Sequence, residues 1–420
     1  MTAATAAARS GVTSIIQNGL SWIDVPTEPD FSRMRREVGA RLRAAMRDND
    51  VDALVLLGNG NVVYATGASW PLLDAGLSHV ERPVAIVGVD DEYPHLFLPA
   101  REGAPLEADL PDDHLHPPLY LEFEEGVEHF GRVLAELVPP GATVAVDELT
   151  GAMRRAGDRL FPTPPIDAAP VVGAAKLVKT PDQIAAVRQA CRITEEAMVD
   201  VQKSLAPGMR QIDLSAHFVR RAFELGATAS MLEAIWQVMP ASLADGAWTT
   251  HGDLALPLLS TERELKQGDV LWTDVSITYG GYCSDFGRTW IVGQEPTEAQ
   301  QAQFHQWRDI LAAVLAVTKA GATSGDLARA GIAAAGGRKP WLPHFYIGHG
   351  IGANAAEMPM IGTDLGPEFD DNFVFPAGML LVLEPVVWED GTGGYRSEEI
   401  VVITDDGWMP LTDYPYDPYR

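Results

Sequence analysis

Apolar residues recur at every fourth position early in the chain, between Phe31 and Asn49. Met34, Val38, Leu42 and Met46 carry this pattern, which is typical of one face of an amphipathic helix. Short apolar runs follow at 53–57, 83–89, 95–99 and 142–146, with turn residues at 58–61 and a helical stretch at 123–138. The pattern predicts a mixed α/β domain over residues 31–175, preceded by a loosely held tail at residues 1–30.

A second domain is predicted over residues 176–420, because a strong helix start follows the first domain. Thr180 is suited to cap a helix, Pro181 fits its first turn and Gln183 completes a capping box. Apolar side chains then recur at steps of three and four residues, at Ile184, Val187, Cys191, Met198 and Val201. We therefore expect a long helix with one buried face, on which Cys191 is a core thiol.

A short repeated spacing of residues within the second domain has two interpretations. Gly208, Asp213 and Leu214 have the same spacing as Gly321, Asp326 and Leu327, and each set precedes a helical stretch. The repeated spacing indicates either two structurally similar halves or two unrelated helix starts that share a glycine turn and an Asp cap.

Two acidic residues lie on opposite arms of a predicted hairpin. Val270–Ile277 is expected to form one strand, Tyr279–Gly281 the turn and Tyr282–Val292 the returning strand. Asp274 and Asp285 are then near cross-strand neighbours, where like charges destabilise the pairing unless a positive charge lies between them. A bound cation would supply that charge.

A second predicted hairpin repeats this arrangement. Met379–Trp388 and Tyr395–Thr404 have the composition of strands, and residues 390–394 connect them. Gly391 is the midpoint in sequence between Glu384 and Glu398, so the two carboxylates are expected to face each other across this hairpin. Both lie within apolar strands, where an isolated charge is costly.

His349 is the fifth member of this candidate set. It lies in the sequence GHGIG, where the flanking glycines let the backbone approach whatever the imidazole contacts. Four carboxylates and one imidazole form an oxygen-rich ligand field that suits a pair of Mn, Fe, Co or Zn ions. Alone, each of these residues is better explained as an ordinary polar or core residue.

Composition and charge narrow the class of protein. With 46% apolar and 21% charged residues the chain has globular composition, and its net charge of −27 disfavours nucleic acid and anionic membranes as partners. The two cysteines, Cys191 and Cys283, are far apart and in no CxxC arrangement, which favours the reducing cytoplasm. No apolar run approaches the roughly 18 residues that a membrane span needs, and the N-terminus lacks the pattern of a secretory signal.

These motifs resemble the pita-bread metallopeptidases, which include methionine aminopeptidase, aminopeptidase P and prolidase, with creatinase as a metal-free relative. The family's five metal ligands match Asp274 in WTDVS, Asp285 in CSDFGRTW, His349 in GHGIG, Glu384 in VLEPV and Glu398 in YRSEEIVVIT. Glu398 is preferred to Glu399 because Arg396 precedes it in the Arg-x-Glu pattern of the prolidase branch. The resemblance implies an α/β (α+β) chain with a creatinase-like N-terminal domain and a C-terminal pita-bread domain.

The chain departs from the peptidase pattern at two places. Family peptidases usually carry a second histidine seven residues after the one in GHGIG, and this chain has Ala356 there. They also carry a histidine before the first Asp ligand, and the nearest candidate, His251, lies 23 residues before Asp274. The resemblance implies catalytic roles for His251 and His344, and substrate contacts for Arg396 and Glu357. The alternatives are an ordinary loop histidine at His251 and a structural residue at His344, and without the second histidine the role of Glu357 is open.

The resemblance implies a cytoplasmic, homodimeric hydrolase with two divalent metal ions. A metal-bound hydroxide would attack the amide carbonyl of a small peptide at an Xaa-Pro bond, with Glu384 accepting a proton from the bridging water. The alternative is a non-peptidase member of the same fold that acts on a small molecule. That member would be a C–N hydrolase of the creatinase or ectoine hydrolase type, or a lyase of the dimethylsulfoniopropionate type. A third hypothesis is a non-catalytic binding protein that keeps the fold.

Overall fold

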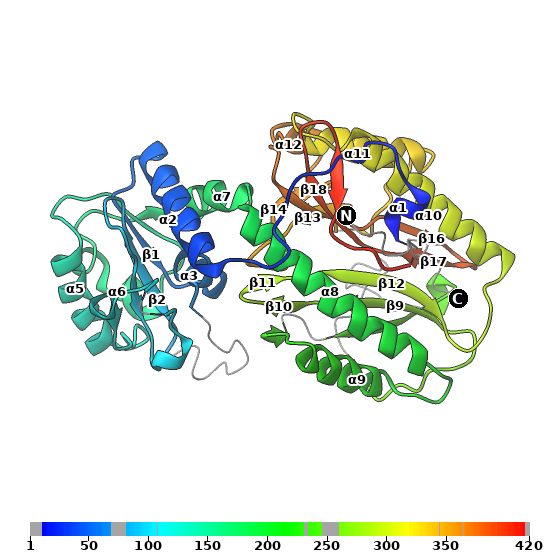
Figure 1. Ribbon diagram of the computed structural model, residues 1–420, viewed down its shortest axis with the longest axis horizontal. Helices are drawn as coiled ribbons and strands as arrows, with labels where there is room; N and C mark the ends of the chain where they lie inside the picture. Colours follow the sequence, from blue (N-terminus) through cyan, green and yellow to red (C-terminus); the bar gives the residue numbers. More distant parts are fainter. Residues whose placement is uncertain are drawn as a thin grey trace. The chain divides into compact units, whose positions relative to one another are not determined.

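The structure is a computed structural model that describes residues 11–68, 81–106, 108–230, 234–245, 260–343, 345–363 and 365–415 (Figure 1). The chain divides into two compact units. One unit is Pro29–Asp182, and the other combines Met1–Glu28 with Gln183–Arg420. The exact domain limits given by the sequence, at 30/31 and 175/176, stay predictions.

The first unit is built on a six-stranded mixed sheet with the order β4-β3-β2-β1-β5-β6. Its strands are β1 (Ala53–Leu56), β2 (Val84–Gly88), β3 (His95–Phe97), β4 (Leu115–His116), β5 (Val144–Val146) and β6 (Ile166–Asp167). Its helices are α2 (Phe31–Asp48), α3 (Asn59–Thr66), α5 (Glu124–Leu137), α6 (Gly151–Ala156) and α7 (Ala169–Leu177), with 3-10 turns η1 (Arg101–Gly103), η2 (Asp112–His114) and η3 (Gly157–Arg159). The helix predicted at 31–49 is confirmed, because α2 buries all four residues of the periodic face.

Alternating side chains of β1 allow helices to cover both faces of this sheet. Val55 and Leu57 pack with Phe130 of α5 and Met153 of α6 in one core. The side chains between them point to the opposite face, on which α2 and α3 lie (Figure 1). The predicted strands at 53–57, 83–89, 95–99 and 142–146 and the predicted helix at 123–138 are therefore confirmed, each to within a few residues.

The turn residues after β1 begin a helix, which the sequence did not predict. Helix α3 starts at Asn59, directly after Gly58. The carboxylate of Asp147 accepts hydrogen bonds from the backbone N–H groups of Leu57 and Gly58 and from the side chain of Asn61, at 2.8, 3.0 and 2.8 Å. A residue far along the chain thus satisfies donors at this helix start.

Residues 11–28 are held more firmly than the sequence suggests. A short helix, α1 (Val12–Ile15), begins the described part of the chain, and Val12 and Ile16 are buried. The backbone of Trp408 donates to Gly19 O and accepts from Ser21 N, both at 2.9 Å. The expectation of a loose tail is wrong for these residues, because their apolar side chains and backbone groups find partners in the second unit.

The described residues of the second unit form four sheets, with the strand orders β12-β9-β8, β14-β13-β15-β18-β19, β11-β10-β7 and β16-β17. The strands are β7 (Ala229–Ser230), β8 (Ile235–Met239), β9 (Val270–Val275), β10 (Ile277–Tyr279), β11 (Tyr282–Cys283), β12 (Phe286–Ile291), β13 (Gly348–Gly350), β14 (Glu357–Ile361), β15 (Leu380–Leu383), β16 (Val386–Glu389), β17 (Gly393–Arg396), β18 (Glu399–Ile403) and β19 (Trp408–Pro410). The helices are α8 (Pro181–Ser204), α9 (Gln211–Glu224), α10 (Glu298–Val317), α11 (Ser324–Ala334) and α12 (Pro367–Asp371), with the 3-10 turn η4 (Leu243–Asp245). Figure 1 shows α8 and α9 beside β9 and β12.

Equivalent contacts recur in two halves of this unit. Gly208 and Gly321 both have positive φ angles, +90° and +84°, and each donates its N–H to a carbonyl five residues before the start of β9 or of β15. The carboxylates of Asp213 and Asp326 each accept a hydrogen bond from the backbone N–H three residues earlier, at the start of the next helix, both at 2.9 Å. These shared contacts favour the interpretation of two similar halves over two unrelated helix starts.

The long helix α8 begins at Pro181, as the capping pattern predicts, and its apolar face is buried. Cys191 is a buried thiol, which confirms it as a core residue, and Cys283 is also buried. Within the described part of the chain, no helix has both the length and the apolar character that a membrane crossing requires.

Glu195 on α8 gives a test of stability against pH. Its carboxylate accepts hydrogen bonds from the backbone N–H groups of Asp413 and Tyr414, at 2.6 and 3.1 Å, and burial raises its pKa to about 7. Because the raised pKa favours proton binding by the folded chain, the contribution of this group to stability is present at low pH and is lost as pH rises through about 7. The neutral Glu195→Gln side chain lacks this dependence. We expect the melting temperature of the variant to rise relative to the wild type between pH 5 and pH 8; a difference that stays constant with pH would contradict the raised pKa.

Candidate metal centre

The first carboxylate pair lies on the hairpin formed by β9 and β12. Asp274 pairs with Gly287, and Val275 pairs with Phe286, so Asp285 is the diagonal neighbour of Asp274. The prediction that the two are near neighbours is confirmed, with a register shifted by two positions. The shift arises because the turn is the two residues Gly280 and Gly281, both at positive φ, while Tyr279 is still in the strand.

The second pair lies where two ladders of the next hairpin meet. Leu383 at the end of β15 pairs with Glu399 at the start of β18, and Val386 at the start of β16 pairs with Arg396 at the end of β17. Glu384 and Glu398 therefore face each other across the gap, as the sequence predicts. The N–H of Glu398 also donates to Gly287 O at 3.0 Å, which links this hairpin to the first one.

His349 lies on β13, directly beside β15. A Cβ atom at Gly348 would lie 2.5 Å from Val382 O, and one at Gly350 would lie 2.5 Å from Met358 O, so both neighbours of the histidine must be glycine. The imidazole Nδ1–H donates to Gly350 O at 2.8 Å. This bond leaves Nε2 as the ring nitrogen that faces the carboxylates; it lies 3.4 Å from Asp285 Oδ2 and 3.4 Å from Glu384 Oε1.

The structure thus brings all five predicted ligands together. One carboxylate oxygen from each of Asp274, Asp285 and Glu398 lies within 4.8 Å of the others, and all three residues are buried. Arg396 is buried among the carboxylates: its Nη2 donates to Asp274 at 3.1 Å, to Glu384 at 2.7 Å and to Glu398. Whether Arg396 also touches substrate stays a prediction.

Crowding of like charges perturbs the ionisable groups of this cluster. Burial, together with the neighbouring carboxylates, raises the pKa of Asp274 to about 7 and raises the pKa values of Glu384 and Glu398. Burial alone would lower the pKa of His349, but the hydrogen bond with Asp285 and the charge of Glu384 raise it to about 9. The cluster therefore favours any positive charge placed within it.

The donor set fits divalent cations. Asp274 Oδ1 and Glu398 Oε2 are buried and have no hydrogen-bond partner in the part of the chain that the structure describes. Buried oxygens of this kind are costly unless a cation or a donor binds them. Four carboxylates against the guanidinium of Arg396 and the imidazole of His349 also leave an excess of negative charge, which a pair of divalent ions would offset.

The structure separates Glu398 from its neighbour Glu399. Glu399 is fully buried on the other face of the strand, where it pairs with Arg288 at 2.7 Å and accepts a hydrogen bond from Thr412. Glu399 is therefore committed to a structural ion pair, and Glu398 is the residue that joins the cluster.

The structure gives the other predicted site residues no contact with the carboxylate cluster among the residues that it describes. Glu357 Oε1 accepts from the N–H groups of Ala353 and Asn354, at 3.0 and 3.2 Å, and so holds its own turn. Ala356 is exposed just before β14. His251 and His344 lie outside the described residues.

Sequence reasoning missed Tyr346, whose ring meets the ring of His349 edge to face at 5.2 Å. Burial, and then the negative charges of Glu384 and Asp285, raise the pKa of its phenol. Its place three residues before His349 in FYIGHG is the one signal that the sequence carries for it.

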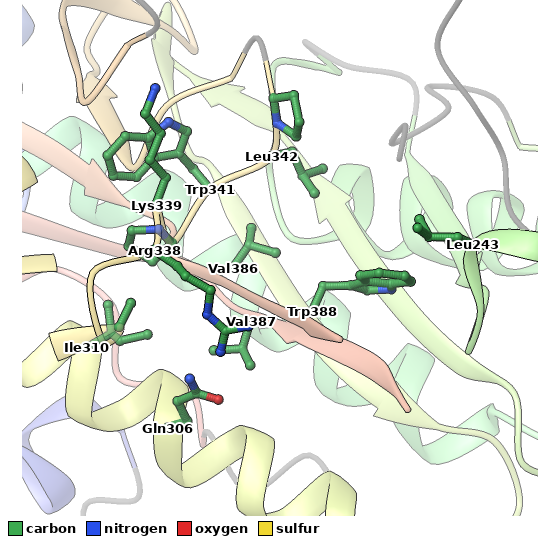
Figure 2. Close-up of a pocket in the computed structure, with 13 residues that line it drawn as sticks. Leu243, Gln306, Ile310, Arg338, Lys339, Trp341, Leu342, Val386, Val387 and Trp388 are labelled. Atoms are coloured by element: carbon green, nitrogen blue, oxygen red, sulfur yellow. The ribbon is translucent and has the colours of Figure 1, made fainter. Parts of the chain in front are cut away.

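A separate cavity of about 300 Å³ lies between α10, the segment before His349 and β16. Figure 2 shows Gln306 and Ile310 on the helix side, with Arg338, Trp341 and Trp388 around the space. None of the five predicted ligands lines it. The cavity is therefore distinct from the carboxylate cluster.

Gly287 gives a test of how tightly the cluster is built. A Cβ atom there would lie 2.8 Å from Cδ and 2.9 Å from Oε1 of Glu398, so Gly287→Ala must displace that carboxylate. We expect metal affinity to fall by about 10–100-fold, as when the groups that orient a metal ligand are lost. Competition with a chelator measures it. Gly131→Ala on α5, whose Cβ would approach nothing closer than 3.7 Å, is the matched control, and equal affinities in the two variants would refute this packing argument.

Comparisons with known proteins agree with this architecture. The family model described as "Creatinase/Prolidase N-terminal domain" matches residues 40–178, and the one described as "Metallopeptidase family M24" matches residues 185–405. A probable dipeptidase PepE from Mycobacterium tuberculosis is 29% identical over 303 residues, 70% of this chain and 75% of the relative. An Xaa-Pro dipeptidase from Pyrococcus horikoshii is 24% identical over 372 residues, 87% of this chain and 94% of the relative.

Among solved structures, the dipeptidase PepE from Mycobacterium ulcerans has a TM-score of 0.70 at 22% identity, over 92% of this chain and 98% of that one. The fold is that of the pita-bread enzymes with a creatinase-like N-terminal domain, as the sequence predicts. The chain belongs to metallopeptidase family M24, whose model covers more than half of it. It is a metallohydrolase that resembles Xaa-Pro peptidases, and the small-molecule alternative is not favoured.

Proposed function

We propose that this chain hydrolyses Xaa-Pro bonds in small peptides with two divalent metal ions. The observation that carries the proposal is the convergence of four buried carboxylates and the Nε2 atom of His349. The proposed ligands are Asp274, Asp285, His349, Glu384 and Glu398. The peptidase names of the similar proteins support the choice of peptide as substrate.

The residues of the cluster have distinct proposed tasks. Bound divalent ions supply Lewis acidity and lower the pKa of a water molecule. Glu384 is proposed to accept the proton of that water; its Oε2 is held by Arg396 at 2.7 Å, and its Oε1 lies 3.4 Å from His349 Nε2. Arg396 orients three carboxylates at once, so it keeps the ligand oxygens in one geometry.

The remaining predicted residues are proposed to act at the substrate. His251 and His344 are proposed catalytic groups, and Glu357 and Arg396 are proposed substrate contacts. The ions are proposed to be Mn, Fe, Co or Zn, which suit mixed carboxylate and imidazole ligands. A homodimer in the cytoplasm is proposed as its working state; two buried cysteines in no CxxC arrangement are compatible with a reducing compartment.

Release of the N-terminal amino acid tests the proposed activity, because cleavage of the Xaa-Pro bond frees that residue from dipeptides and from longer peptides alike. Protein stripped of metal would be loaded separately with Mn²⁺, Co²⁺, Fe²⁺ or Zn²⁺ and given a panel of Xaa-Pro dipeptides and longer Xaa-Pro-Xaa peptides. Matched peptides with alanine in place of proline are the control. We expect at least one metal to give turnover that requires proline in the second position. Absence of turnover from protein with two ions bound per chain would contradict the peptidase assignment.

A further inference from the structure

Tyr346 combines three features that mark a group free to act on substrate. Its ring lies edge to face against that of the proposed ligand His349, at 5.2 Å. The side chain is only partly buried. Its hydroxyl has no hydrogen-bond partner among the residues that the structure describes. A phenol beside the cluster thus has an unused donor and access to solvent.

The position of this phenol is fixed by its neighbours. Phe345 stacks on Tyr346, with ring centroids 4.4 Å apart, and the ring of His349 lies on another side. The peptide segment leads directly into β13, where the glycines beside His349 are packed against neighbouring carbonyls. A donor held in this way loses little conformational freedom when it binds an oxygen.

The proposed chemistry lacks one hydrogen-bond donor. The peptidases that this chain resembles carry a second histidine where it has Ala356, and alanine supplies no polar group. Hydrolysis of an amide places negative charge on the former carbonyl oxygen, and a preorganised donor to that oxygen contributes strongly to the rate.

We propose that the Tyr346 hydroxyl donates a hydrogen bond to the carbonyl oxygen of the scissile bond as it becomes the tetrahedral oxyanion, a task for which Ala356 has no donor. This inference rests on the proposed peptidase function. The phenol keeps its proton throughout, since tyrosine is protonated at neutral pH.

The test is Tyr346→Phe, which removes the hydroxyl and keeps both ring contacts. We expect kcat for an Xaa-Pro peptide to fall by about 10²–10³-fold, the usual effect of losing one oxyanion donor, with KM unchanged. Bound metal and melting temperature should match the wild type. A phosphinic dipeptide analogue, whose tetrahedral oxygen resembles the oxyanion, should lose affinity in parallel with kcat. Tyr120→Phe, at an exposed tyrosine of the first unit, is the matched control.

A second variant tests whether the lost group acts as a hydrogen-bond donor to substrate. Adding Ala356→His to Tyr346→Phe restores an imidazole at an exposed position and is expected to recover part of the lost kcat. An unchanged kcat in Tyr346→Phe, with an active wild type, overturns this inference and leaves the peptidase function standing. Loss of bound metal in that variant also overturns it, because the tyrosine would then be a positioning residue for His349. A wild type that cleaves no peptide overturns both.

Discussion

Replacing Asp285 with alanine is expected to remove most of the bound metal and most of the activity. Asp285 lies within reach of Asp274, Glu398 and His349 Nε2, so its loss deletes a shared oxygen donor from the middle of the cluster. Loss of a group that only orients a ligand costs about 10–100-fold, and loss of a ligand itself should exceed that range. Metal per chain by mass spectrometry and proline release in the same samples measure both effects.

The matched control is Asp309→Ala, which removes an exposed carboxylate from α10. It changes the net charge of the chain by the same amount but leaves the cluster intact. We expect it to bind metal and release proline as the wild type does. Full metal occupancy in Asp285→Ala would contradict the ligand assignment.

Removing Arg288 alone is expected to destabilise the second unit strongly. Its guanidinium and the Glu399 carboxylate are both fully buried and lie 2.7 Å apart, with Arg288 also above the ring of Phe286 at 4.5 Å. Arg288→Met leaves the carboxylate without its cation in a place that water does not reach. Breaking a buried pair in this way costs about 3–5 kcal/mol of the free energy of unfolding, which urea titration measures.

The double variant Arg288→Met/Glu399→Leu is the control for this prediction. With both charges gone, neither partner is left buried without compensation, so most of the lost stability should return. A single variant that costs less than about 1 kcal/mol would show that the pair contributes no more than a surface salt bridge.

Much of the fold was predictable because its signals are local. The periodic face at Met34–Met46 gives α2, and the Gly280–Gly281 turn fixes the hairpin that carries Asp274 and Asp285. The second carboxylate pair was predicted in the same way, from two residues equally far from a turn. The prediction holds because the register of β15 and β18 continues into β16 and β17. Local pattern and final structure agree wherever neighbours in the sequence are also neighbours in space.

The features that escaped prediction depend on distant residues. Helix α3 begins among turn residues because Asp147, far along the chain, accepts their N–H groups. Residues 11–28 are ordered by Trp408, near the other end of the sequence. Tyr346 acquires its place beside His349 through the strand geometry, and the sequence alone records only that the two are three residues apart.

The central claim is that Asp274, Asp285, His349, Glu384 and Glu398 jointly hold two divalent ions. The most direct measurement is a crystal structure of manganese-loaded protein with anomalous scattering recorded above the manganese edge. The account predicts two anomalous peaks among these five side chains, roughly 3.5–4 Å apart, as in other two-metal sites. A single peak, or peaks bound to other residues while these carboxylates contact only Arg396, would contradict it.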